Sequence, residues 1–253
     1  MLLAIDVGNT TISLVLIREG KIHLSWSVLT ADSARTLEKS LRTIFRKIKR
    51  EKNLQGVVVC SVVPRVLAIV VPLAQKEFAV KVWVVGKDVL VPIKNRYCYP
   101  QQVGQDRLVG AYAAKILYGT PLIVIDFGTA ITLDVVSKNG EYRGGIIVPG
   151  IRLTTEALFK KTALLPQVKI MRPKELIGRD TTNSILSGIF YGYGALCDGL
   201  IAQISRALKA KPHVVATGGY VDTMKQFAQK IELVDQSLIF KGLEMIYQSR
   251  PRR

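Results

Sequence analysis

Two stretches of the chain share one pattern of apolar and polar positions. Residues 2–14 read LLAIDVGNTTISL and residues 122–134 read LIVIDFGTAITLD, so each stretch runs an apolar segment into an aspartate, a glycine turn and an alternating segment. An unbroken apolar run is typical of a strand buried on both faces, and alternation is typical of a strand with one buried face. The pattern therefore predicts a β-hairpin at each place, with a glycine turn just after the aspartate.

The two predicted hairpins lie 120 residues apart, and the similarity continues beyond their turns. Identical residues pair at this offset: Ile5 with Ile125, Asp6 with Asp126, Gly8 with Gly128, Val15 with Val135, and Gly20 with Gly140. A repeat of this length is too long for a solenoid and indicates two copies of one domain, each with its own core. We therefore predict an α/β domain over residues 1–119 and another over residues 120–253, each a mixed sheet flanked by helices.

The remaining pattern alternates short apolar strands with helices. The predicted strands cover 56–64, 80–85, 141–151 and 213–219, and the predicted helices cover 65–77, 105–118 and 181–208, the last with Asp180 or Thr181 as its N-cap. Asp6 interrupts the first apolar run too early for a signal peptide, and the other apolar stretches are shorter than the roughly 20 residues of a membrane helix. We therefore expect a soluble cytoplasmic protein.

The charge balance is strongly positive, with 36 Lys and Arg against 19 Asp and Glu. Much of the excess lies in residues 35–52 and in the final SRPRR. Apolar residues recur at helical spacing within 35–52, which predicts an amphipathic helix with a basic outer face; they are Leu37, Leu41, Ile44 and Ile48. We interpret this face as solvated, so nucleic acid is not expected as a partner, although phosphate binding is the alternative. The positive field would also attract an anionic substrate.

The cysteines and histidines suggest no site of their own. Cys60, Cys98 and Cys197 have no CxxC spacing, so they indicate neither a disulfide framework nor a zinc site, and we interpret all three as packing thiols. His23 and His213 lie outside every motif and are assigned no role.

The paired turns carry the first chemical signal. A glycine two residues after a strand-terminal aspartate lets backbone N–H groups approach a phosphate with no Cβ in the way. Asn9 and Thr10 in one turn and Thr129 in the other add side-chain donors. A single hairpin of this kind could be only a tight turn with a capping aspartate, but turn chemistry alone does not require both the acid and the hydroxyl in two copies. The pair predicts a site for a polyphosphate and its cations, in a cleft between the two domains.

Further motifs follow these turns in order along the chain. They are DVGNT at 6–10, SVVP at 61–64, YCYPQQVGQDR at 97–107, DFGTA at 126–130, GGIIVPG at 144–150, Thr181 within GRDTTNSILSG, and TGG at 217–219. Together they resemble the acetate and sugar kinase, Hsc70 and actin superfamily, and more closely the type III pantothenate kinases. One departure is Tyr99, where an asparagine is expected before the proline. The resemblance implies duplicated actin-like (ribonuclease H-like) domains.

The resemblance also implies roles for individual residues. The residues expected to bind ATP are Asp6, Val7, Gly8, Asn9, Thr10, Thr11, Ile12 and Thr129, with Gly218 and Gly219 beneath the adenine and ribose. Those expected to bind the substrate are Tyr97, Gly104, Gln105, Asp106, Arg107 and Thr181, and Asp106 is the expected catalytic base. The expected cation ligands are Asp126, for potassium or ammonium, and Asp6, for magnesium directly or through water.

The chemistry of the acceptor agrees with these assignments. Pantothenate presents a carboxylate, an amide and hydroxyls, so its site needs an arginine clamp and hydroxyl donors, which Arg107, Tyr97 and Thr181 can supply. Taken singly, each residue has a simpler interpretation: Asp106 as a first-turn acid, Arg107 as a surface ion-pair partner, Tyr97 as an edge aromatic and Thr181 as an N-cap.

The resemblance implies an ATP-dependent phosphotransferase with an alcohol acceptor, which converts pantothenate to 4'-phosphopantothenate in the first step of coenzyme A biosynthesis. The alternatives are a kinase of another small hydroxy acid and a non-catalytic, basic, nucleic-acid-binding regulator. A homodimer is also expected, because Gly188, Gly192 and Gly199 lie near one face of the helix over 181–208 and would admit another helix. Close packing within one subunit is the competing explanation.

Overall fold

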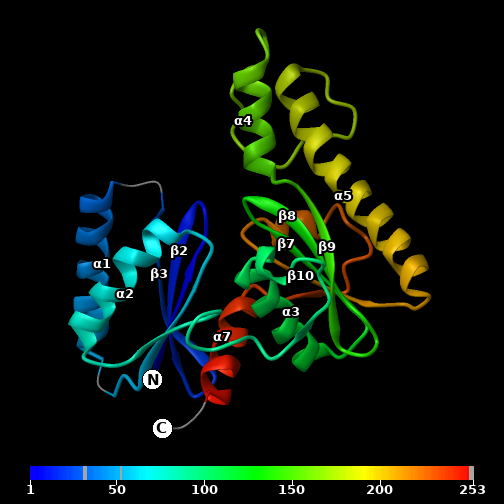
Figure 1. Ribbon diagram of the computed structural model, residues 1–253. Coiled ribbons are helices and arrows are strands. Elements are labelled where there is room, and N and C mark those ends of the chain that lie inside the picture. Colours follow the sequence, from blue (N-terminus) through cyan, green and yellow to red (C-terminus); the bar gives the residue numbers. More distant parts are fainter. Residues whose placement is uncertain (31–32, 52, 251–253) are drawn as a thin grey trace. The chain divides into compact units, whose positions relative to one another are not determined.

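The computed structural model describes residues 1–30, 33–51 and 53–250, and it divides the chain into two compact units (Figure 1). The first unit comprises Met1–Ile93, Cys98–Ala113 and Ser237–Arg253, and the second comprises Lys94–Tyr97 and Ala114–Gln236. The C-terminal helix thus belongs with the first unit, whereas the predicted division at residues 119 and 120 assigned it to the second domain.

The first unit is built on a five-stranded mixed sheet in the order β3-β2-β1-β4-β5. Its strands are β1 (Leu2–Val7), β2 (Thr11–Arg18), β3 (Lys21–Leu29), β4 (Gly56–Ser61) and β5 (Val82–Val84), and its helices are α1 (Ala34–Lys49), α2 (Pro64–Phe78), the first part of α3 (Gln105–Tyr118) and α7 (Leu238–Ser249). β1 is antiparallel to β2 and parallel to β4, so the predicted first hairpin is confirmed.

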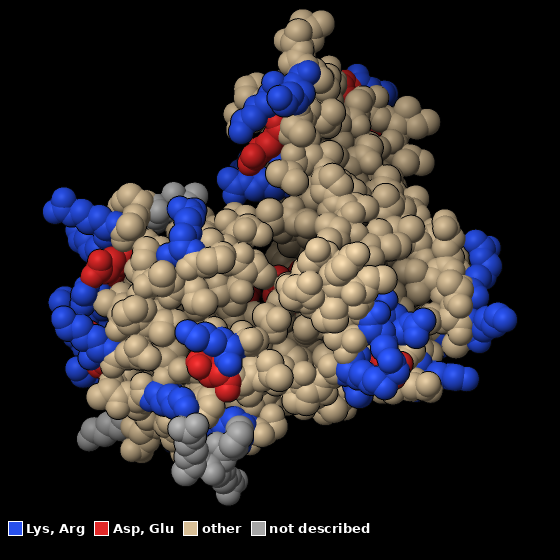
Figure 2. Space-filling view, in the orientation of Figure 1, with Lys and Arg blue, Asp and Glu red and all other residues tan. Residues whose placement is uncertain are grey.

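Both faces of this sheet are covered, which explains the unbroken apolar run of β1. Leu3 and Ile5 pack in one core with α1 and α2, whereas Leu2 and Ala4 pack in another with α7. The predicted apolar positions of α1 are all buried, and its outer face is basic (Figure 2). Lys52 and residues 251–253, which the charge analysis included, lie outside the described residues.

α7 is locked into the first unit by a close contact with the start of β4. The hydroxyl of Tyr247 donates a hydrogen bond to the carbonyl of Gln55, 3.0 Å away. An added Cβ at Gly56 would lie 2.7 Å from Cε2 of Tyr247, so only glycine leaves room for the ring there. Leu243 and Ile246 of the same helix are completely buried in the core that contains Leu2 and Ala4.

The second unit is built on a six-stranded mixed sheet in the order β11-β10-β7-β8-β9-β6. Its strands are β6 (Lys94–Asn95), β7 (Leu122–Phe127), β8 (Ala130–Val136), β9 (Glu141–Pro149), β10 (His213–Thr217) and β11 (Leu233–Val234). Its helices are α4 (Ile151–Lys161), α5 (Thr181–Leu208) and α6 (Val221–Met224). The 3₁₀ turn η1 (Pro100–Gln102) belongs to the first unit. Apolar residues of β7, β10 and α5 form the core of this unit.

The duplication predicted from the sequence is confirmed by the sheet topology. Strands β3-β2-β1-β4-β5 correspond in order and direction to β9-β8-β7-β10-β11. The second hairpin is one residue shorter, however, because Val15 pairs with Ala4 whereas Asp134, not Val135, pairs with Val124. The fold is kept because the apolar positions of β8 are shifted with the register, so that Ile131 and Leu133 are buried as Ile12 and Leu14 are in β2.

The structure corrects two smaller predictions. Cys60 and Cys197 are buried as expected, but Cys98 is exposed, so it is not a packing thiol. α5 is long and apolar enough to cross a membrane by length and composition alone, which the sequence analysis did not anticipate. Residues such as Ile185 and Phe190 nevertheless pack in the core of the second unit, as in the core helix of a globular domain.

Candidate active site

The first glycine turn is braced from outside the hairpin. The amide of Gly8 donates to the carbonyl of Thr11 across the turn, 2.9 Å away. Thr30 donates its hydroxyl to the carbonyl of Gly8 (2.8 Å) and its amide to the carbonyl of Thr10 (2.9 Å). Thr30 is almost fully buried, and nothing in the local sequence pattern distinguishes it from any polar residue after a strand. The brace leaves Asn9 exposed at the tip of the turn, where a ligand can reach it.

Two of the predicted acids come together in the first unit. Asp6 and Cys60 are register partners on β1 and β4, so their side chains leave the same face of the sheet. Burial raises the pKa of the Cys60 thiol well above its usual value, and the nearby carboxylates of Asp6 and Asp106 raise it further. Asp106 lies 100 residues from Asp6 in the sequence, yet both carboxylates act on this one thiol.

The backbone around Asp106 is shaped to its carboxylate. Asp106 lies in the first turn of α3, and its Oδ1 accepts a hydrogen bond from the amide of Arg107, 2.8 Å away. A Cβ added at Gly104 would overlap Oδ1 of Asp106, so glycine is required for the carboxylate to hold this position. Gln105 packs against Gly86, whose added Cβ would lie 2.7 Å from Cδ of Gln105. Gly104 and Gln105 therefore fix the start of α3.

The second glycine turn resembles the first, but a different residue, Gly150, is hydrogen-bonded to it from outside the turn. The amide of Gly128 donates to the carbonyl of Ala130 (3.2 Å), and the amide of Gly150 donates to the carbonyl of Thr129 (3.1 Å). Gly150 can approach so closely because it has no Cβ, which would lie 2.5 Å from the carbonyl oxygen of Gly128. Thr129 is exposed at the tip of its turn, as Asn9 is in the first hairpin.

Asp126 and Gly218 meet at the ends of neighbouring strands. Asp126 on β7 is the register partner of Thr217 on β10, which places Gly218 just beyond the carboxylate. Gly218 has a φ of +97°, and an added Cβ would lie 2.6 Å from the amide nitrogen of Phe127 and would overlap Oδ1 of Asp126. Glycine at 218 therefore lets the chain pack closely against Asp126 and Phe127, while a Cβ at Gly219 would meet nothing within 4 Å.

Tyr97 and Thr181 are the two predicted substrate contacts in the second unit. The ring of Tyr97 lies over Gly144, whose φ is +109° and whose added Cβ would lie 3.2 Å from the ring. Thr181 is the first residue of α5 and is exposed. The cap of α5 is Asp180, whose carboxylate accepts from the amide of Asn183 at 2.7 Å, so the N-cap interpretation of Thr181 is wrong. Its side chain is therefore not committed to capping.

Charged clusters for metal binding are absent from the part of the chain that the structure describes, since no group of three His, Cys, Asp or Glu side chains is placed to hold an ion there. Magnesium at kinase sites is usually held by one or two carboxylates together with substrate phosphates. Asp6 fits that pattern as a single carboxylate beside a glycine turn. Asp126 likewise offers a single carboxylate beside the second glycine turn.

Solved structures of kinases share this fold. The chain is similar to a ROK family glucokinase from Streptomyces griseus in complex with glucose and AMPPNP, with 12% identity, 98% of this chain and 99% of that chain covered, and a TM-score of 0.57. It is also similar to a Baf family transcriptional activator candidate from Campylobacter jejuni, with 20% identity, 97% of each chain covered and a TM-score of 0.62. The duplicated domains and their hairpins define an actin-like fold.

Sequence comparison assigns the chain to one family. The family model described as type III pantothenate kinase matches residues 2–203. Proteins named type III pantothenate kinase are 36% identical in Listeria monocytogenes serotype 4a and 35% identical in Listeria welshimeri serovar 6b, over 251 residues that cover 98% of this chain and 96% of each relative. The chain belongs to the type III pantothenate kinase family.

Proposed function

We propose that the chain transfers the γ-phosphoryl group of ATP to the primary hydroxyl of pantothenate, which yields ADP and 4'-phosphopantothenate in the first step of coenzyme A biosynthesis. Family membership supports this reaction. The structural observation that carries it is the convergence of Asp6, at the first phosphate turn, and Asp106, the proposed base, around Cys60. That convergence supports a shared site, because the turn proposed to bind the nucleotide and the proposed acid–base group both lie near Cys60 in the first unit.

The proposed roles are those that the family resemblance implies for each residue. The turn amides after Asp6 and Asp126, together with Asn9, Thr10 and Thr129, donate to ATP phosphates. Their glycines leave the backbone open to approach. The glycines after β10, Gly218 and Gly219, line the nucleoside part of ATP. The remaining residues proposed to bind ATP are Val7, Gly8, Thr11 and Ile12.

Residues around α3 and the second unit bind the acceptor in this proposal. Arg107 clamps the pantothenate carboxylate with charge-assisted hydrogen bonds, and the hydroxyls of Tyr97 and Thr181 orient its polar groups. Asp106 accepts the proton of the primary hydroxyl as the new phosphate ester bond forms. Because phosphoryl transfer depends on positioning and on charge stabilisation, a fixed carboxylate at the start of α3 suits this role.

Two cations complete the proposed site. Asp6 would hold magnesium, directly or through water, and Asp126 would hold potassium or ammonium. When bound, these cations supply positive charge that neutralises the phosphate oxygens.

We also propose a homodimer formed through the exposed face of α5. An added Cβ at Gly188, Gly192 or Gly199 would meet nothing within 4 Å, which speaks against packing of these glycines inside one subunit. The one glycine of α5 that does pack internally is Gly194, against Phe227. Light scattering at micromolar concentration would then give twice the 28.0 kDa mass of one chain, and a mass of one chain would exclude the dimer.

The decisive experiment is an ADP-release assay with and without pantothenate, combined with detection of 4'-phosphopantothenate by mass spectrometry. Pantothenate-dependent ADP and the phosphorylated product are expected. ADP release that requires a different small hydroxy acid would replace the acceptor but keep the kinase. No acceptor-dependent ADP at all would favour a non-catalytic protein. The cytoplasm is the proposed location, since ATP is the phosphoryl donor.

A further inference from the structure

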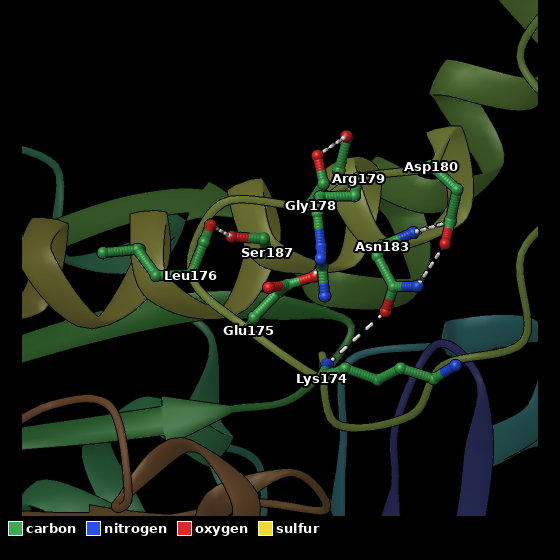
Figure 3. Close-up of polar contacts among 9 residues, drawn as sticks. Lys174, Glu175, Leu176, Gly178, Arg179, Asp180, Asn183 and Ser187 are labelled. Atoms are coloured by element: carbon green, nitrogen blue, oxygen red, sulfur yellow. Dashed lines mark hydrogen bonds and ion pairs between the residues drawn. The ribbon is translucent and has the colours of Figure 1, made fainter.

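A short segment before α5 is tied to the first turns of that helix by helix side chains (Figure 3). We name residues 174–180 the strap. Asn183 accepts a hydrogen bond from the amide of Lys174 at 3.4 Å, and Ser184 donates to the carbonyl of Gly178 at 3.1 Å. Ser187 donates to the carbonyl of Leu176. The strap has no helix or strand of its own, so these bonds determine its path along the helix.

The contact at Gly178 has no tolerance for a side chain. An added Cβ there would lie 2.5 Å from the carbonyl carbon of Asn183 and would overlap the amide nitrogen of Ser184. Both obstructing atoms belong to the backbone of α5, so they cannot turn aside as a flexible side chain could. Any residue larger than glycine must push the strap away from the helix.

Thr181 lies directly between the strap and the residues that hold it. Asp180, at the end of the strap, accepts from the amide of Asn183 at 2.7 Å and from its side-chain amide at 2.6 Å. Thr181 is therefore joined on one side to a segment fixed by Gly178 and Ser187, and on the other to the first turn of α5. Its own side chain is nevertheless exposed.

We infer that Gly178, Asn183 and Ser187 are positioning residues for Thr181, and that they act through the strap to set where its hydroxyl meets the acceptor. The inference rests on the proposed function, in which Thr181 contacts pantothenate. Ser187 is 5% exposed, so its hydroxyl bond to the strap is shielded from water.

The test uses a matched pair of serine substitutions on one helix. Ser187→Ala removes the bond to the strap, whereas Ser205→Ala removes a hydroxyl bond to the carbonyl of Ile201 within α5, far from the strap. Steady-state kinetics should show a raised KM for pantothenate and an unchanged KM for ATP in Ser187→Ala, with both values unchanged in Ser205→Ala. Gly178→Ala should raise KM for pantothenate more, by about tenfold or more, because it displaces the strap itself.

A double-mutant cycle separates positioning from a general structural effect. If the strap acts through Thr181, adding Ser187→Ala to Thr181→Ala should change KM for pantothenate no further. The inference is overturned if Ser187→Ala keeps the wild-type KM for pantothenate, or if its effect persists in full in the Thr181→Ala background. Failure of the proposed function would look different, since the wild-type chain would then release no ADP in response to pantothenate. Ser187→Ala carries the test even if Gly178→Ala does not fold.

Discussion

Replacement of Gly104 by alanine should displace the proposed catalytic base while leaving the rest of the fold in place. Gly104 is not among the glycines with a positive φ, so alanine introduces no backbone strain there. The added Cβ would overlap Oδ1 of Asp106, and its contact with Cγ1 of Val62 at 3.5 Å is an ordinary one. The carboxylate of Asp106 is therefore the one group that must move.

The size of that movement sets the expected effect. Oδ1 of Asp106 must retreat by about 1 Å to reach ordinary van der Waals separation, which also strains its 2.8 Å bond from the amide of Arg107. A displacement of about 1 Å in a reacting group can lower the rate by on the order of 10²-fold. The cost to folding is smaller, about 0.5–1.5 kcal/mol for a side chain forced away from its rotamer.

The assay compares Gly104→Ala with Gly110→Ala. Gly110 lies in α3, and an added Cβ there meets nothing within 4 Å, so this control should keep the wild-type kcat and gain stability of about 0.5–1 kcal/mol. Gly104→Ala should lose about 10²-fold in kcat. Its calorimetric ATP affinity should remain that of wild type, because the turns proposed to hold the phosphates are unchanged.

Two results would refute this reasoning. A folded Gly104→Ala variant with more than about a tenth of the wild-type kcat would show that the position of Asp106 does not limit the reaction. A loss of ATP affinity parallel to the loss of kcat would assign Asp106 to the nucleotide site instead.

Three further outcomes are expected. Asp106→Asn should lower kcat by roughly 10² to 10⁴ while ATP affinity survives, and near-normal kcat would refute the role as base. Asp126→Ala should lose activation by potassium or ammonium and most activity, and an unchanged response to cation concentration would show another ligand. Glu141 has its pKa lowered to about 2 by hydrogen bonds from Arg96 and Lys94. Its contribution to stability is therefore present above pH 4.5 and lost as the pH falls toward about 2, and Arg96→Ala should flatten that part of an acid-unfolding curve.

The parts of the fold that were predicted correctly are those with local signals. The hairpins, α1 and α5 follow from apolar periodicity, and Asp180 is a strong N-cap type directly before a long apolar pattern. The turns at Gly8 and Gly128 could be predicted because the residues around these glycines recur at an offset of 120 residues. Gly20 and Gly140, which that offset pairs, both adopt positive φ, at 74° and 72°.

The parts that were missed depend on contacts between distant residues. The hydrogen bonds from Thr30 depend on how β3 returns beside the first turn, and no property of Thr30 itself predicts them. The shorter second hairpin is hidden by the constant offset, because Val135 aligns with Val15 in sequence but not in register. The strap has no periodic pattern from which it could be predicted. Its backbone is held instead by hydrogen bonds with side chains of α5. Membership of α7 in the first unit likewise has no local signal.

The place of α7 in the first unit has a consequence for the order of folding during protein synthesis. The strands of the first sheet are made before α7, so the core that Leu2 and Ala4 share with Leu243 and Ile246 cannot close until α7 has emerged from the ribosome. Residues 114–236, which make up nearly all of the second unit, have by then been completely synthesised. The core around β1 is therefore completed only after the second unit has been made.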